Sequence, residues 1–329
     1  MRAVQAREFG GPEVLVLGDL PQPEPAPEEV RIEVAAADVM FLDTRLRSGW
    51  GTDYFPVRPP YVPGGAIAGI VREAGAAADP SWVGRRVMSV TTASGIGGGV
   101  PVGGYAEQAL AKADTLIEVP EQVSFEQAAA LVHDGRMAVA LFERAEVHPG
   151  DHVLITAAAG GLGTLLIQFA HQAGATVVAA ARGRAKLDLT TRLGADVAVD
   201  YSETGWPDRV LAATGGAGPR IVWDGAGGAL GETALGLVAD AGRFLGYGAA
   251  AGEFVTTTGV ERAKARGVDV IGLHDLDADF DAAARRALAQ VAAGTIEVVV
   301  GQSFPLEQAH EAHSAIEARA ALGRTLLVR

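Results

Sequence analysis

The fold can be predicted from the segment Asp151-His152-Val153-Leu154-Ile155-Thr156-Ala157-Ala158-Ala159-Gly160-Gly161-Leu162-Gly163, which continues through residues 164–173. A short apolar run is followed by a turn of small residues and then by a segment with helical periodicity. The order of strand, glycine-rich turn and helix predicts a βα unit in which the turn lets a ligand approach the backbone.

Two glycines of this turn match the dinucleotide-binding fingerprint. Gly160 and Gly163 fall on its second and third glycine positions, and Ala158 replaces the first. We expect the pyrophosphate of a dinucleotide to accept hydrogen bonds from free N–H groups of the turn and helix start. The residues expected to line it are Ala158, Gly160, Gly161, Leu162 and Gly163. A chain with 43 glycines can also produce such a pattern by chance, so a plain βα turn is the alternative.

The next apolar run, residues 176–181, ends in the basic segment Arg182-Gly183-Arg184-Ala185-Lys186. An enzyme that uses NAD usually places an acidic residue here to hold the ribose 2′-hydroxyl group. Arginine and lysine suit a 2′-phosphate instead, so the sequence favours NADPH over NADH. An ordinary basic helix start is the alternative, although cations there oppose the helix dipole.

Composition excludes several other classes of protein. The net charge of −13 disfavours nucleic acid and membrane surfaces as partners, and the absence of cysteine removes disulfides and every sulfur-based zinc site. No segment reads as a signal peptide or a membrane span, so we expect a cytoplasmic protein. No metal site is predicted, because His310 and His313 more simply form a polar face of the last helix.

The chain divides into two patterns. Residues 1–122 read as short strands between Gly and Pro, whereas residues 123–273 alternate helices with apolar runs, as in a doubly wound parallel sheet. The tail, residues 274–329, is too short to bury a core and is expected to pack onto an earlier domain. The predicted fold class is therefore α/β, with a mainly β domain and a parallel-sheet domain.

Motifs along nearly the whole chain resemble the zinc-independent quinone oxidoreductase branch, the ζ-crystallin-like proteins, of the medium-chain dehydrogenase/reductase superfamily. They include Phe41-Leu42-Asp43-Thr44, Pro60-Tyr61-Val62-Pro63-Gly64, Gly103-Gly104-Tyr105-Ala106-Glu107 and Asp224-Gly225-Ala226-Gly227-Gly228. The resemblance implies a GroES-like catalytic domain (1–122 and 274–329), a Rossmann NADPH-binding domain (123–273) and a homodimer.

The resemblance also implies cofactor contacts outside the turn. Lys186 and Tyr201 match the family's pair at the adenosine 2′-phosphate, with Arg182 or Arg184 assisting. Further matching positions are Tyr247 and Gly248, beside the nicotinamide, and Arg319 near the C-terminus.

The substrate side departs from the family pattern. Met40 stands where many members have Asn, Met137 replaces an expected Thr, and the tyrosine expected after Ser-Gly is displaced to Tyr54.

Candidate proton donors and acceptors are Tyr54, Asp43, and the adjacent His133 and Asp134. Tyr54 can equally be a packing residue, and Asp43 can instead accept backbone N–H groups. His133 could shuttle protons near neutral pH, but adjacent helical residues diverge, so a structural role for Asp134 and Arg136 is the simpler interpretation.

The leading hypothesis is an NADPH-dependent reductase of a quinone or an α,β-unsaturated carbonyl, both small-molecule acceptors. An enoyl reductase of a biosynthetic pathway shares the fold and cofactor. A non-catalytic, NADPH-binding redox sensor is the alternative from another class.

Overall fold

The computed structural model describes residues 1–53, 55, 57–92 and 102–329. The Cα trace separates into two compact units, one of residues 1–133 with 284–329 and the other of residues 134–283. Each unit is described by itself below.

The unit of residues 134–283 contains a parallel sheet of six strands in the order β10-β9-β8-β11-β12-β13. The strands are β8 (His152–Thr156), β9 (Thr176–Ala181), β10 (Val197–Asp200), β11 (Ile221–Asp224), β12 (Arg243–Gly246) and β13 (Asp269–Ile271). Apolar side chains of the central strands are buried on both faces, as expected for strands covered by helices on each side. The strand order reverses between β8 and β11, which defines the edge where ligands bind in such sheets.

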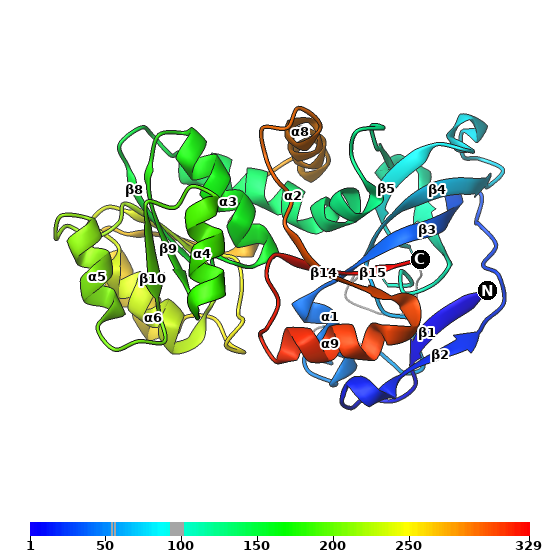
Figure 1. The fold of residues 1–329 in the computed structure, drawn as a ribbon, viewed down its shortest axis with the longest axis horizontal. Helices are drawn as coiled ribbons and strands as arrows, with labels where there is room; N and C mark the ends of the chain where they lie inside the picture. The colour runs from blue at the N-terminus through cyan, green and yellow to red at the C-terminus, as the bar shows by residue number, and fades with distance from the viewer. Residues whose placement is uncertain (54, 56, 93–101) are drawn as a thin grey trace. The chain divides into compact units, whose positions relative to one another are not determined.

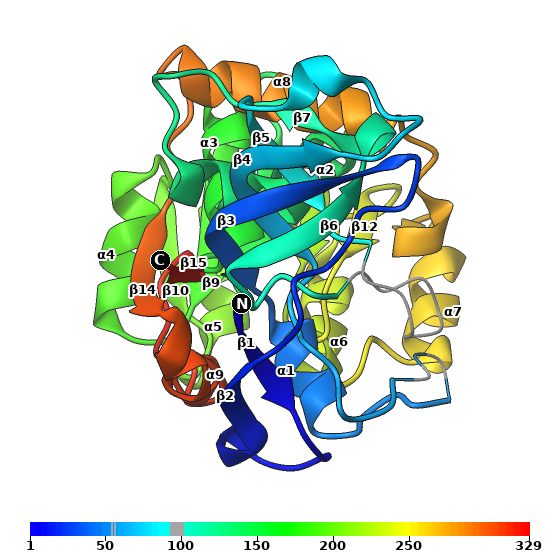
Figure 2. The same cartoon turned by 90° about the vertical axis from the view of Figure 1, so that its right-hand side faces the viewer.

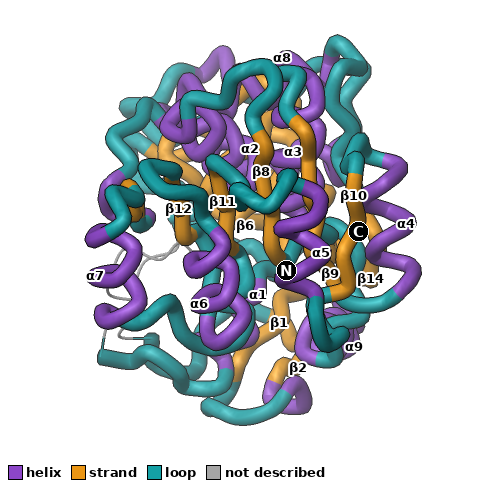
Figure 3. The backbone as a smooth tube through the Cα atoms, turned by 90° about the vertical axis from the view of Figure 1, so that its left-hand side faces the viewer, coloured by secondary structure: helices purple, strands orange, loops and turns teal. Residues whose placement is uncertain are grey.

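Helices between the strands cover both faces of this sheet. On one face lie α3 (Gly161–Gln172) and α4 (Arg184–Arg192); on the other lie α5 (Trp206–Ala213) and α6 (Gly228–Leu237), next to α7 (Thr257–Ala265) (Figures 1 and 3). This arrangement follows from right-handed crossovers between parallel strands. The predicted doubly wound sheet is confirmed.

The unit of residues 1–133 and 284–329 is built around β3 (Glu29–Val39) (Figure 2). One edge of β3 pairs with β4 (Ala66–Ala74), which continues to β5 (Arg86–Val90) and β7 (Ile117–Glu118). The other edge pairs first with β6 (Gln108–Lys112) and then, from Ala36 to Val39, with β15 (Arg324–Val328). A single long strand thus links strands from distant parts of the sequence.

Residues 284–329 of the C-terminal tail belong to this unit, whereas residues 274–283 belong to the other one. Within the tail, β14 (Val300–Pro305) pairs with β15, and α9 (Ala309–Glu317) lies between them in sequence. The buried Asp38 of β3 forms an ion pair with Arg324 at the start of β15, which fixes the register of the two strands.

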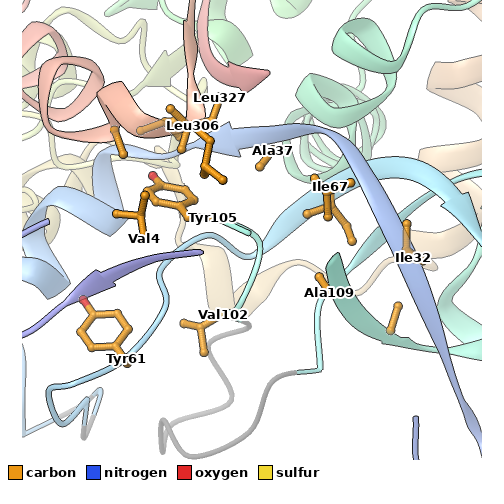
Figure 4. Close-up of a cluster of buried hydrophobic side chains, with 14 of the residues drawn as sticks. Val4, Ile32, Ala37, Tyr61, Ile67, Val102, Tyr105, Ala109, Leu306 and Leu327 are labelled. Atoms are coloured by element: carbon orange, nitrogen blue, oxygen red, sulfur yellow. The ribbon is translucent and has the colours of Figure 1, made fainter. Parts of the chain in front are cut away.

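The core of this unit combines residues from its first and last segments. Figure 4 shows Val4, Ile32, Ile67, Leu306 and Leu327 among its buried side chains. Val4 belongs to β1 (Arg2–Ala6), which pairs with β2 (Leu15–Asp19). β1 was not predicted, because its five residues, Arg-Ala-Val-Gln-Ala, do not alternate regularly between polar and apolar.

Three further α-helices are α1 (Phe41–Arg47), α2 (Phe125–Ala145) and α8 (Phe280–Ala292). A reciprocal pair of hydrogen bonds between Ser124 and Gln127 caps the start of α2. The sequence analysis did not predict α1, a helix of two turns whose apolar residues are too few to reveal a period. No helix in the described ranges is long and apolar enough to cross a membrane.

Candidate active site

The turn after β8 joins a strand to a helix in the order predicted from the sequence. Ala157 adopts a left-handed conformation (φ 49°), and the Ala158 N–H donates to the carbonyl oxygen of Ala180 on β9 at 3.1 Å. Helix α3 then begins at Gly161, with Gly160 as its N-cap. The turn is therefore attached to the neighbouring strand while the first N–H groups of α3 lie at the ligand-binding edge.

Gly163 is the position where only glycine fits. A Cβ atom there would lie 2.6 Å from the carbonyl oxygen of Ala158 and 2.8 Å from its Cα atom. At Gly160 a Cβ would approach only the Ala157 oxygen, at 3.3 Å. Gly163 therefore allows close packing of α3 on the turn, whereas Gly160 keeps the outer side of the turn free of side-chain atoms.

Thr156 and Asp224 join the strand ends on either side of the reversal point. The Thr156 hydroxyl donates to Oδ1 of Asp224 at 2.5 Å, and the other carboxylate oxygen accepts the Gly227 N–H at 3.1 Å. Asp224 is buried, and that burial raises its pKa. The sequence analysis cited Asp224 only as part of a motif; a buried strand that ends in Asp beside glycines was the available signal.

Tyr247 lies against the same strand ends. It follows β12, and its hydroxyl donates to the backbone oxygen of Thr156 at 3.1 Å. A Cβ atom at Gly225 would lie 2.6 Å from the tyrosine ring, so glycine at 225 makes room for this side chain. Gly248 packs equally closely, since its Cβ would lie 2.8 Å from the oxygen of Gly225. The structure thus brings Tyr247 and Gly248 beside the end of β8.

The basic segment lies at the end of β9, next to the end of β10. The Tyr201 N–H donates to the oxygen of Ala181, and the Gly183 N–H donates to the Asp200 carboxylate at 2.8 Å. Arg182 is exposed at the same edge. The predicted residues Arg182 and Tyr201 are therefore close in space, with one acidic residue, Asp200, beside them.

Two other cations of this segment lie on the first turn of α4. Arg184 forms an ion pair with Asp188 at 2.8 Å, and its side chain remains 88% exposed. Such exposed pairs contribute little, so Arg184 can exchange this partner for a phosphate at small cost. Lys186 is half-buried and lies on the same helical turn as Arg184, after the end of β9.

Asp43 is buried at the start of α1. Its Oδ2 accepts the Met40 N–H at 2.9 Å and the Tyr105 hydroxyl at 3.3 Å, and its side chain is 1% exposed. Burial raises the pKa of Asp43 to about 6. These are the contacts of a helix-capping residue that fixes the backbone at Met40.

His313 on α9 extends this buried cluster, so the expectation that His310 and His313 form one polar face of the last helix is wrong: His310 is exposed, whereas His313 is fully buried. Its Nε2 lies 2.9 Å from the Tyr105 hydroxyl, and burial, with a smaller effect of Arg47, lowers its pKa to about 3. The unfolded chain therefore binds a proton on this imidazole more tightly than the folded chain does. The free energy of unfolding accordingly falls as the pH drops below about 6.5. Asp43 acts oppositely: its contribution is present below about pH 4 and is lost as pH rises through 6.

The remaining predicted residues are spread over the chain. His133 and Asp134 lie within α2, where the two compact units meet in sequence, and Asp134 is buried. Asp134 is close enough to Tyr247 to add to the rise in the pKa of Tyr247 caused mainly by burial. Arg319 is exposed just after α9, with a φ of 56°. Tyr54 lies outside the described residues.

Comparison with known proteins places this architecture in a family. The model of the alcohol dehydrogenase GroES-like domain matches residues 26–121, and that of the zinc-binding dehydrogenases matches residues 161–289. A quinone oxidoreductase of Pseudomonas aeruginosa is 31% identical over 99% of both chains. The chain belongs to the quinone oxidoreductase branch of the medium-chain dehydrogenase/reductase superfamily. The family and fold predicted from the sequence are thus confirmed.

Other members of this superfamily show the same extent of similarity. A 2-haloacrylate reductase of Burkholderia sp is 30% identical over 97% of this chain and 96% of its own. The Escherichia coli quinone oxidoreductase, solved in complex with NADPH, superimposes with a TM-score of 0.88 at 28% identity, and the match covers 100% of both chains. The chain is accordingly an oxidoreductase enzyme of this type.

Two positions set this quinone oxidoreductase relative apart from the expected family pattern. Met40, at the N-cap of α1, and Met137, on α2, are both half-buried thioethers where the family pattern led us to expect amide and hydroxyl groups. Neither can donate a hydrogen bond. In the described part of the chain, no group of three or more His, Asp or Glu residues is placed to hold a metal, and the sequence has no cysteine.

Proposed function

We propose that the enzyme is an NADPH-dependent reductase that transfers hydride to a quinone or another α,β-unsaturated carbonyl compound without zinc. The observation that carries this proposal is the turn after β8, where Gly160 and Gly163 leave the backbone uncovered by side chains. The basic segment of residues 182–186 follows the neighbouring strand, β9. Bound NADPH would supply the hydride, and the chain would supply position and electrostatic field.

The residues fit a dinucleotide in two separate ways. The backbone of Ala158–Gly163 offers N–H groups to the pyrophosphate, and Gly163 lets α3 approach the turn closely enough to present them. Arg182, Lys186 and Tyr201 would hold the 2′-phosphate, with Arg184 assisting. Asp200 is already bonded to the Gly183 N–H and therefore orders the loop.

On the nicotinamide side, Tyr247 and Gly248 would border the ring. Tyr247 is held by Thr156 and its pKa is raised by burial, so it remains a neutral hydrogen-bonding and packing group at physiological pH. Arg319, which follows α9, would also contact the cofactor. We further propose residues 1–122 with 274–329 as the catalytic domain and residues 123–273 as the NADPH-binding domain.

The four acid–base candidates have different roles in this proposal. Tyr54 remains the candidate donor to an enolate oxygen, because Asp43 already accepts two hydrogen bonds and is buried. We assign Asp43 a positioning role at Met40, and Asp134 a role beside Tyr247, with His133 as its neighbour. A quinone acceptor needs no dedicated side-chain donor, since water can protonate the product oxygen.

An enoyl or acrylate reductase is the second candidate. It is favoured by the similarity to a 2-haloacrylate reductase, a protein named for an activated alkene as substrate. A protein that binds NADPH as a redox sensor, without turnover, is the alternative from another class.

The test is NADPH and NADH oxidation by the purified protein with quinones, enones and enoyl thioesters in parallel. We expect turnover with NADPH and with at least one quinone or enone. Turnover restricted to enoyl thioesters would select the enoyl reductase. Stabilisation by NADPH without oxidation by any acceptor would contradict the enzyme and favour the sensor. Sedimentation and cell fractionation would test the expected cytoplasmic homodimer.

A further inference from the structure

The outward face of α1 carries an aromatic and cationic surface that the hydride-transfer proposal does not use. Phe41 is 38% exposed, and Arg45 follows it by four residues, so the two side chains lie on one face of the helix. Asp43, Leu46 and Arg47 are buried on the other side. The helix thus presents Phe41 and Arg45 while its remaining residues anchor it.

Arg45 is held over an indole ring. Its guanidinium carbon lies 5.0 Å from the centroid of the Trp50 ring. The backbone N–H of Trp50 donates to the backbone oxygen of Arg45 at 3.0 Å. Phe55 lies on Trp50 with ring centroids 6.4 Å apart. These contacts orient the guanidinium before any ligand binds, which reduces the entropy lost on binding.

Arg45 and Arg47 differ although they belong to the same short helix. Arg47 is 1% exposed and forms an ion pair with Glu317 on α9. Arg45 is half-exposed and forms no ion pair with any carboxylate in residues 1–53, 55, 57–92 or 102–329. A contact with an aromatic ring engages the charge of a guanidinium but leaves its N–H donors available to an anion.

We infer that Phe41, Arg45 and Trp50 form a recognition surface for an acceptor that carries a carboxylate beside a planar, apolar body. The guanidinium would bind the carboxylate through two parallel N–H donors, and the exposed rings of Phe41 and Trp50 would pack on the apolar part. The inference rests on the proposed function, because the ligand of this surface is taken to be the compound that accepts the hydride.

The negative net charge of the chain makes Arg45 more important for binding an anionic acceptor. The chain has a formal charge of −13, so an anionic acceptor is repelled at long range. An oriented arginine with no ion pair among the described residues can reverse that repulsion at short range. Arg45 is therefore a specificity-determining residue in this proposal and takes no part in hydride transfer.

The first experiment compares two acceptors with the same reacting group. We would use a 1,4-naphthoquinone that carries a propionate side chain, and the methyl ester of the same compound, with NADPH and the full-length chain. Arg45→Gln should raise KM for the carboxylate about ten-fold or more, from loss of a charge-assisted hydrogen-bonded pair, and change KM for the ester less than about two-fold. The kcat should not change with either acceptor, and Arg45→Lys should restore part of the KM effect.

Arg85→Gln is the matched control, because Arg85 is an exposed cation of the same unit paired with Glu118. It should leave both KM values unchanged. Equal effects of Arg45→Gln on the two acceptors, or no effect on either, would overturn the inference while leaving the proposed hydride transfer intact.

A second measurement separates failure of the inference from failure of the proposed function. Binding of 2-naphthoate and of methyl 2-naphthoate, neither of which is reduced, is measured by calorimetry with NADP⁺ present. We expect 2-naphthoate to bind the wild type more tightly than the ester, and Arg45→Gln and Trp50→Leu each to weaken it. Selective naphthoate binding without any turnover would reject hydride transfer yet support the anion surface; no preference for naphthoate would overturn the surface itself.

Discussion

Substitution of Gly163 by alanine tests the phosphate-binding turn directly. The new Cβ would lie 2.6 Å from the Ala158 oxygen, whereas ordinary contacts begin at 3.4 Å, so helix and turn must separate by several tenths of an ångström. Overpacking of this kind costs about 1–3 kcal/mol, and the better helix propensity of alanine returns up to about 1 kcal/mol. The displaced Ala158 backbone should also weaken NADPH binding, by about ten-fold, or ~1.4 kcal/mol.

Gly236→Ala is the matched control for this substitution. Gly236 also lies in a helix of the same unit, α6, but no atom lies within 4 Å of a Cβ placed there. It should be neutral or stabilising by up to about 1 kcal/mol and should not affect NADPH binding. Thermal unfolding with and without NADPH measures both effects, because stabilisation by a ligand depends on its Kd. If G163A matched the wild type in stability and Kd, our account of the turn would be wrong.

Three further predictions concern other parts of the structure. Arg182→Ala with Lys186→Ala should raise KM for NADPH by about ten-fold or more with little change for NADH, as seen in steady-state kinetics; equal changes would place the 2′-phosphate elsewhere. In the wild type, the free energy of unfolding should fall by up to about 5 kcal/mol between about pH 6.5 and 3 because of His313. His313→Gln should remove this part of the pH dependence, as measured by urea titrations at several pH values. Trp223→Ala should cost about 3–5 kcal/mol of stability, because Trp223 is fully buried on β11; a smaller loss in urea unfolding would mean that the sheet repacks.

Much of the unit of residues 134–283 follows from local sequence patterns. The strands β8 and β9 are continuous apolar runs, and the turn between β8 and α3 is a run of small residues, so composition and order alone predicted them. The basic segment after β9 likewise indicated the cofactor class. Shorter elements such as β1 and α1 were missed, because five or seven residues hold too few apolar positions to show a period.

The contacts of the site depend on residues far apart in the chain. Tyr105 and His313 are 208 positions apart, and Thr156 and Asp224 are 68 apart. No local pattern marks such partners, because a side chain's neighbours are set by which strands pair. For this reason Asp43 looked from its motif like a candidate acid, while the fold surrounds it with the Met40 N–H and Tyr105.

Sequence patterns were therefore enough to predict the βα unit at residues 151–173, the parallel sheet and the cationic strand end, since each depends on neighbouring residues and on backbone geometry. Three facts emerge only in the folded chain: Gly163 has no room for a methyl group, Tyr247 rests on Gly225, and Arg47 pairs with Glu317 whereas Arg45 has no ion pair among the described residues. These facts depend on packing between segments that the strand order brings together.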